Sequence, residues 1–181
     1  MMKRNRALVG YQQLNASVVG VFRRQAFSEV RVLERLVYVS TAALRRDLEV
    51  QASRIAAEVE ARNFADGVAG ALLGHDGHFV QALEGERPAL DRLLKRLEAD
   101  PRHYDLVLVD RWRVDEPLFD GWGMGAVAMD AALRSDLDAL IGNPTLNPRP
   151  MVETMRSRAI PPTSMLREAG PEERGRVGRS L

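Results

Sequence analysis

The chain has no cysteine among its 181 residues, so disulfide scaffolds, cysteine nucleophiles and zinc sites built from thiolates are excluded. It also has no run of about 18 apolar residues, and we therefore expect no membrane-spanning helix. The first six residues are basic, but no long apolar stretch follows them. We therefore expect no secretory signal and a cytoplasmic location.

The formal net charge is only +1, but the charges are unevenly distributed along the chain. Residues 1–35 hold seven basic and two acidic side chains, and residues 144–181 hold seven and four. The middle, residues 36–143, holds the remaining 12 basic and 19 acidic side chains. An acidic body between basic ends argues against nucleic acid as a partner, and it suggests that the ends are additions to the domain.

Hydrophobic residues make up 45% of the chain and charged residues 28%, which is enough apolar material for the core of one domain. The apolar pattern alternates between short β-branched runs and helical stripes. Asp76-Gly77 lies between two apolar runs, which is the strongest short signal for a hairpin. We predict strands over 36–40, 68–73, 78–83 and 106–109, with one helix over 44–63 and a second that begins near Pro88 and ends just before Pro101.

This β-α-β-β-α-β order predicts an α+β fold, the ferredoxin-like antiparallel sheet with two helices on one face. Residues 123–128 fit either a short last strand or the start of a helix. A further helix is expected over 131–141, and a shorter one near Met151. The segment from Pro161 is rich in proline, glycine and charge, and we expect it to be disordered.

Several polar side chains fall where the pattern calls for apolar ones. The stripe of the first helix, formed by Leu48, Ala52, Ile55 and Val59, continues onto Arg62 and Asn63. Asn63 is therefore either a helix cap or a functional amide. Gln81 lies between Phe79 and Leu83 on one side of a strand, so it is either buried and hydrogen-bonded or merely wetted on an open face.

Tyr38 lies in an aliphatic strand and is either an ordinary core aromatic or a phenol with a buried partner. Arg96 and Asp100 stand four residues apart beside the second helix's stripe, which is typical of a solvated charge pair, and His103 follows. Together these side chains could converge on a flat ligand whose edge offers both hydrogen-bond donors and acceptors. The isoalloxazine ring of a flavin has such an edge, and a carboxamide pairs well with it.

Three other signals carry little weight. Residues 121–126 fit the G-x-G-x-x-A pattern, but they follow a polar loop and not a strand, so no dinucleotide fold is expected there. His75 and His78 flank the hairpin tip without a third ligand nearby, so we expect no metal site. No Ser–His–Asp arrangement or nucleophile elbow is present, and we expect no enzymatic activity.

Beyond these patterns, the sequence resembles the BLUF family of blue-light sensors that bind FAD. The resemblance rests on Leu36-Val-Tyr38-Val-Ser40, Asn63, Phe79-Val-Gln81-Ala-Leu83-Glu-Gly85, Asp100-Pro-Arg-His103 and Trp122-Gly-Met124, and it covers roughly residues 34–128. It implies the ferredoxin-like fold with the flavin between its two helices. The family often has an aromatic residue at the place of Gly74, so we expect the strand to be less packed there.

The resemblance also implies roles for individual residues. Asn63 would bind the carbonyl and imide edge of the ring, and Gln81 would lie between the flavin and Tyr38. Tyr38 would donate an electron and then a proton to the excited flavin, and the hydrogen bonds around Gln81 would rearrange. Trp122 and Met124 would report this change, and in the family either residue type occupies the inner place. Further flavin-contacting positions would be Ile55, Arg62, Phe79, Arg96, Asp100 and His103.

We therefore predict an N-terminal extension over residues 1–33, a flavin-binding photosensor over 34–128, and a C-terminal helical extension with a basic tail over 129–181. Only about 50 residues follow residue 128, too few for a fused cyclase or phosphodiesterase domain. Output would then pass through the C-terminal helices to a self-association surface or a separate partner. The alternatives are a ferredoxin-like regulator without a chromophore and a small hydrolase or flavin enzyme on the same fold.

Overall fold

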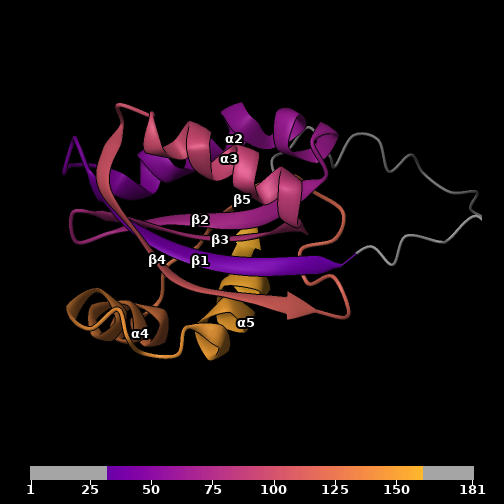
Figure 1. The fold of residues 1–181 in the computed structure, drawn as a ribbon. Helices are drawn as coiled ribbons and strands as arrows, with labels where there is room; N and C mark the ends of the chain where they lie inside the picture. Colours follow the sequence, from indigo (N-terminus) through magenta and orange to yellow (C-terminus); the bar gives the residue numbers. More distant parts are fainter. Residues whose placement is uncertain (1–31, 161–181) are drawn as a thin grey trace, which may run out of the picture. The chain divides into compact units, whose positions relative to one another are not determined.

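A computed structural model describes residues 32–160, which form a six-stranded sheet between two layers of helices (Figure 1). The strands are β1 (Leu33–Ala42), β2 (Val68–His75), β3 (His78–Glu86), β4 (His103–Val114), β5 (Gly125–Val127) and β6 (Ala159–Ile160). The helices are α2 (Leu48–Ala65), α3 (Arg87–Glu98), α4 (Ala131–Gly142) and α5 (Arg149–Arg158). The predictions for residues 1–31 and 161–181 lie outside the described residues.

The sheet has the order β4-β1-β3-β2-β5-β6, and only the pairing of β2 with β5 is parallel. Helices α2 and α3 lie together on one face of it, which confirms the ferredoxin-like prediction (Figure 1). Alternation within the strands decides this packing, because Phe79 and Leu83 of β3 point to α2 and α3 while Val80 and Ala82 point to the opposite face.

The β2–β3 hairpin is closed by the predicted turn. Asp76 and Gly77 both have positive φ, 42° and 78°, which is the backbone that a type I′ turn requires. The turn fixes the pairing register, so that His75 lies opposite His78 and Leu72 opposite Gln81. This register carries Gln81 to the middle of the sheet.

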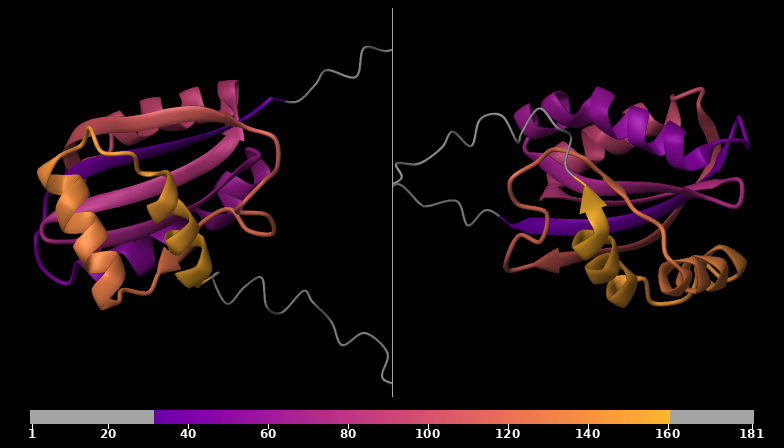
Figure 2. Two further views of the ribbon diagram at one scale, coloured as in Figure 1. Left: turned by 90° about the horizontal axis from the view of Figure 1, so that it is seen from below. Right: turned by 180° about the vertical axis from the view of Figure 1, so that it is seen from behind.

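Helices α4 and α5 cover the other face of the sheet, as the view from below shows (Figure 2). Helix α4 begins at Asp130, whose side chain accepts a hydrogen bond from the Leu133 amide at 2.9 Å. Residues 125–127 form the short strand β5, which settles the open alternative for this segment. The sequence pattern did not predict β6, because two residues are too short to show a period.

The expectation of looser packing at Gly74 is wrong. The first turn of α2 lies directly on this residue, and a Cβ there would come within 2.6 Å of the Leu48 carbonyl oxygen. Glycine is required because the helix backbone approaches the strand this closely. None of the helices within residues 32–160 is both long and apolar enough to cross a bilayer.

Candidate functional site

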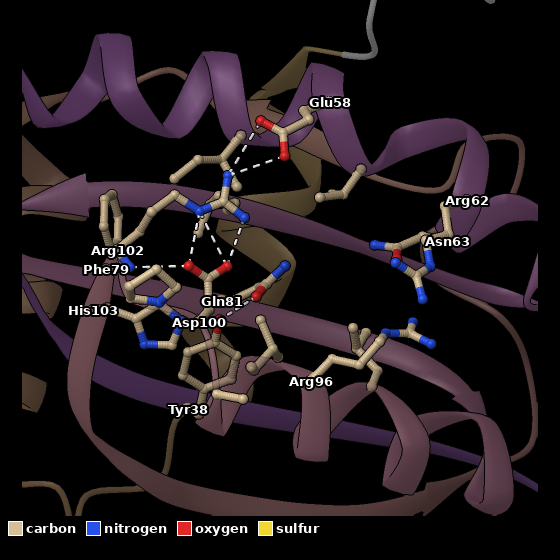
Figure 3. A pocket seen from close by; sticks show the side chains of 17 residues that line it. Tyr38, Glu58, Arg62, Asn63, Phe79, Gln81, Arg96, Asp100, Arg102 and His103 are labelled. Carbon is tan, nitrogen blue, oxygen red and sulfur yellow. Dashed lines mark hydrogen bonds and ion pairs between the residues drawn. The ribbon is translucent and has the colours of Figure 1, made fainter.

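A cavity of about 710 Å³ opens between α2 and α3, with β1 and β3 as its floor (Figure 3). A volume of this size suits a small organic molecule or a cofactor ring. The structure brings all nine residues predicted to bind a cofactor to its lining: Tyr38, Ile55, Arg62, Asn63, Phe79, Gln81, Arg96, Asp100 and His103.

The floor of the cavity holds a short chain of buried hydrogen bonds. Tyr38 and Gln81 lie opposite each other on β1 and β3, and the Tyr38 hydroxyl donates to Gln81 Oε1. Gln81 Nε2 donates in turn to Met124 Sδ at 3.2 Å. Gln81 is only 3% exposed, so the alternative that it is wetted on an open face is wrong.

The phenol of Tyr38 is held in its protonated form. Burial raises the pKa of Tyr38 above its usual value, and the negative charge of Asp100 raises it further. A protonated phenol can act as a hydrogen-bond donor to the carboxamide oxygen. The hydrogen bond between Tyr38 and Gln81 therefore has a defined direction.

Met124 and Trp122 lie on opposite sides of the sheet. Met124 is fully buried among the side chains beneath α2 and α3, whereas Trp122 packs with those of α4 and α5. Residues two apart in a regular strand would share one face, but these two precede β5, in a loop where Gly121 has a φ of 95°. Met124 is therefore the inner residue in this structure, a point that the sequence left open.

Two buried polar atoms in the cavity wall have no hydrogen-bond partner among the described residues: Asn63 Nδ2 and His103 Nδ1. Asn63 lies in the last turn of α2 and is 2% exposed. The helix ends at Ala65 with Asp66 as its C-cap, so Asn63 is not the cap. Burial lowers the pKa of His103 despite the nearby Asp100, which favours the neutral imidazole. Buried polar atoms normally find partners, so these two fit a polar ligand in the cavity.

The charged side chains of the site pair differently from the sequence prediction. Arg96 contacts Asp66 at the end of α2, at 2.9 Å, and does not pair with Asp100. Asp100 instead binds Arg102 at 2.6 Å, and hydrogen bonds from that guanidinium lower the pKa of Asp100. The helical i,i+4 prediction is wrong because α3 ends at Glu98, before Asp100.

Sequence reasoning missed Arg102 and Glu58, which also line the cavity. Arg102, the residue before β4, reaches Glu58 on α2 at 3.3 Å, so it crosses one side of the cavity (Figure 3). The signal was present, because Arg102 stands between Pro101 and His103 in a segment already singled out. The remaining lining is apolar and comes from the helical stripes, from β2 and from the segment after α3: Val59, Leu72, Leu93, Leu97, Ala99 and Pro101.

The sequence around this site matches a known protein family. Residues 33–125, about half of the chain, match the family described as BLUF, sensors of blue light using FAD. The chain belongs to the BLUF family. This membership favours a blue-light sensor with FAD as its cofactor over a regulator without a chromophore.

Among curated relatives, the chain is 34% identical over 87 residues to the photoactivated adenylate cyclase subunit beta of Euglena gracilis, and 39% identical over 87 residues to subunit alpha. These matches cover 48% and 46% of this chain, but it spans only about a tenth of the length of either relative, 10% and 8%.

Solved BLUF structures match over more of their length. The dark-state structure of BlrB, a BLUF protein, shares 32% identity with a TM-score of 0.54, over 71% of this chain and 96% of that one. The ground state of BlsA shares 26% identity with a TM-score of 0.59, over 68% and 87%.

Proposed function

We propose that residues 34–128 hold the isoalloxazine ring of FAD in the cavity between α2 and α3, and that Tyr38 and Gln81 carry the light response. The observation that carries this proposal is the buried chain from Tyr38 through Gln81 to Met124, placed at the floor of a cavity whose wall offers unpartnered polar atoms. Most buried polar atoms in folded proteins have a hydrogen-bond partner, so the two unpartnered atoms of the cavity wall support a bound polar ligand.

The lining divides into groups suited to the parts of a flavin. The Asn63 carboxamide carries one donor and one acceptor group, which match the adjacent N–H and C=O of the ring edge. Ile55 and Phe79 supply apolar surface for the flat ring. Arg62 and Arg96 are cations at the cavity, and they suit the phosphates of the cofactor despite the acidic body of the domain.

The photochemical step would depend on Tyr38 and Gln81. When bound, FAD supplies the absorption of blue light and an acceptor for an electron from the tyrosine. Tyr38 keeps its proton in the dark. It would pass first an electron and then this proton to the excited ring, and it would regain both as the ring returns to its oxidised state. Gln81 would then turn or tautomerise. In the dark its Oε1 accepts from Tyr38 and its Nε2 donates to Met124, and this change would exchange the donor and the acceptor. Each hydrogen bond is worth about 1 kcal/mol net, enough to bias a two-state element.

The output would pass through the C-terminal extension, residues 129–181, to a second copy or a separate signalling partner. Helices α4 and α5 support this route because they pack on the sheet face that holds Trp122. We expect no catalytic activity from the chain itself. Light scattering in the dark and under blue light tests self-association, and a mass that is the same in both conditions and equal to that of a monomer would favour a separate partner.

The central proposal is tested on purified protein. We expect bound FAD at close to one equivalent, and an absorption spectrum that shifts slightly to the red under blue light and recovers in the dark. The Asn63→Ala variant should bind FAD more weakly. A protein that takes up no FAD, or whose flavin spectrum does not respond to light, would contradict the proposal.

A further inference from the structure

Trp122 is held on the outer side of the sheet by two contacts from different elements. Its indole Nε1 donates to the Gly70 carbonyl oxygen of β2 at 3.0 Å, and the Arg156 guanidinium of α5 lies 4.3 Å from the ring centroid. A cation over an indole face is the most favourable cation–π arrangement. The ring is only 7% exposed, so it is enclosed as well as anchored.

Arg156 also holds the loop that precedes Trp122. Its Nε donates to the Leu118 carbonyl oxygen at 2.7 Å. The amide of Leu118 donates to the Glu84 carboxylate at 3.0 Å, and Arg35 pairs with that carboxylate at 2.5 Å. The amide of Leu118 is therefore bound by β3, the strand that carries Gln81, and its carbonyl oxygen is bound by α5.

The position of this loop decides which residue meets Gln81. Gly123 separates Trp122 from Met124, and a Cβ at Gly123 would lie 2.1 Å from the Glu60 carbonyl oxygen of α2. The backbone is thus pressed against α2, and the two neighbouring side chains lie on opposite sides of the sheet. With Trp122 bound to Arg156, Met124 is the residue whose sulfur accepts the hydrogen bond from the Gln81 amide.

We propose that Arg156 is a positioning residue that keeps Trp122 outside the sheet and so sets Met124 as the dark-state partner of Gln81. The proposal rests on the photosensory function proposed above. Arg156 belongs to α5. A change in the hydrogen-bond partner of Gln81 that moves Trp122 must therefore also weaken the contacts that Arg156 makes from this helix. Coupling of this kind is reciprocal, so loosening α5 also alters the surroundings of Gln81.

The test compares two substitutions on the same helix in the FAD-bound protein. Arg156→Met keeps an aliphatic stem but removes the cation and the donor to Leu118. The matched control is Arg149→Met, because Arg149 lies 4.8 Å from the centroid of a different ring, that of Trp112, and binds Asp110 at 3.1 Å. We expect dark recovery to slow by about three- to tenfold in Arg156→Met, and to stay within about 1.5-fold in the control.

A second measurement needs no photochemistry. In a Trp112→Phe background, Trp122 is the single tryptophan, and its quenching by acrylamide should rise about twofold when Arg156→Met is added. Unchanged recovery together with unchanged quenching would overturn the role of Arg156. If the unaltered protein shows no red shift, the photosensory function fails instead, and the quenching still decides whether Arg156 holds Trp122.

Discussion

Replacing Tyr38 by Phe and Gln81 by Leu, singly and together, measures the coupling energy of the hydrogen bond at the floor of the cavity. Both side chains are almost fully buried, 2% and 3% exposed, and the Tyr38 hydroxyl donates to Gln81 Oε1. Each single change leaves one buried polar group without its partner, which costs about 1–3 kcal/mol of unfolding free energy. The double change removes both groups and should cost only about 1 kcal/mol. With about 2 kcal/mol for each single change, the coupling energy is therefore expected to be about 3 kcal/mol.

Urea unfolding at a saturating FAD concentration measures these energies, with the FAD affinity of each variant determined separately, because bound ligand adds to stability. Tyr104→Phe is the matched control, since Tyr104 lies on the edge strand β4 and is half exposed. It should change stability by less than about 0.5 kcal/mol. Additive effects of Tyr38→Phe and Gln81→Leu, with a coupling below about 0.5 kcal/mol, would refute the reasoning.

The same two single variants test whether the light response can be lost while FAD binding is kept. Both should still bind FAD, because Asn63 and the apolar lining are untouched. Neither should show the light-induced red shift, because each lacks one member of the switching pair. A normal photocycle in either variant would contradict the roles assigned to Tyr38 and Gln81.

Three further outcomes follow from the geometry. Gly123→Ala forces α2 away from the loop and should destabilise the fold by about 1–3 kcal/mol in urea unfolding, whereas Gly142→Ala, which meets no atom within 4 Å, should not. Asn63→Ala should weaken FAD binding about tenfold in a fluorescence titration, because it loses hydrogen bonds worth about 1.4 kcal/mol; unchanged affinity would exclude Asn63 as a ligand residue. Since burial raises the pKa of Tyr38, only the unfolded chain loses this proton near pH 10, so stability should fall as pH rises above about 10. The fall should be smaller in Tyr38→Phe, by up to about 1.4 kcal/mol at pH 11, and an equal fall would show that the phenol is not buried.

Local patterns were sufficient for most of the elements. The Asp76-Gly77 turn and the alternation through Phe79, Gln81 and Leu83 place β3 correctly, because turn chemistry and strand period are properties of neighbouring residues. Burial of Gln81 could be suspected from its apolar neighbours. The pairing of Arg96 with Asp66 could not, because these residues are 30 positions apart and come from different helices.

The sequence by itself therefore determined the order of the main strands and helices, nine of the residues that line the cavity, and the family. Only the tertiary structure decided that Met124 lies inside and Trp122 outside, and that Arg102 crosses the cavity to Glu58. It also decided that Arg156 binds the loop before β5. The physical reason is the range of the interactions. Period and turn type act over a few residues, whereas these contacts depend on how α2, α5 and the loop before β5 pack on opposite faces of one sheet.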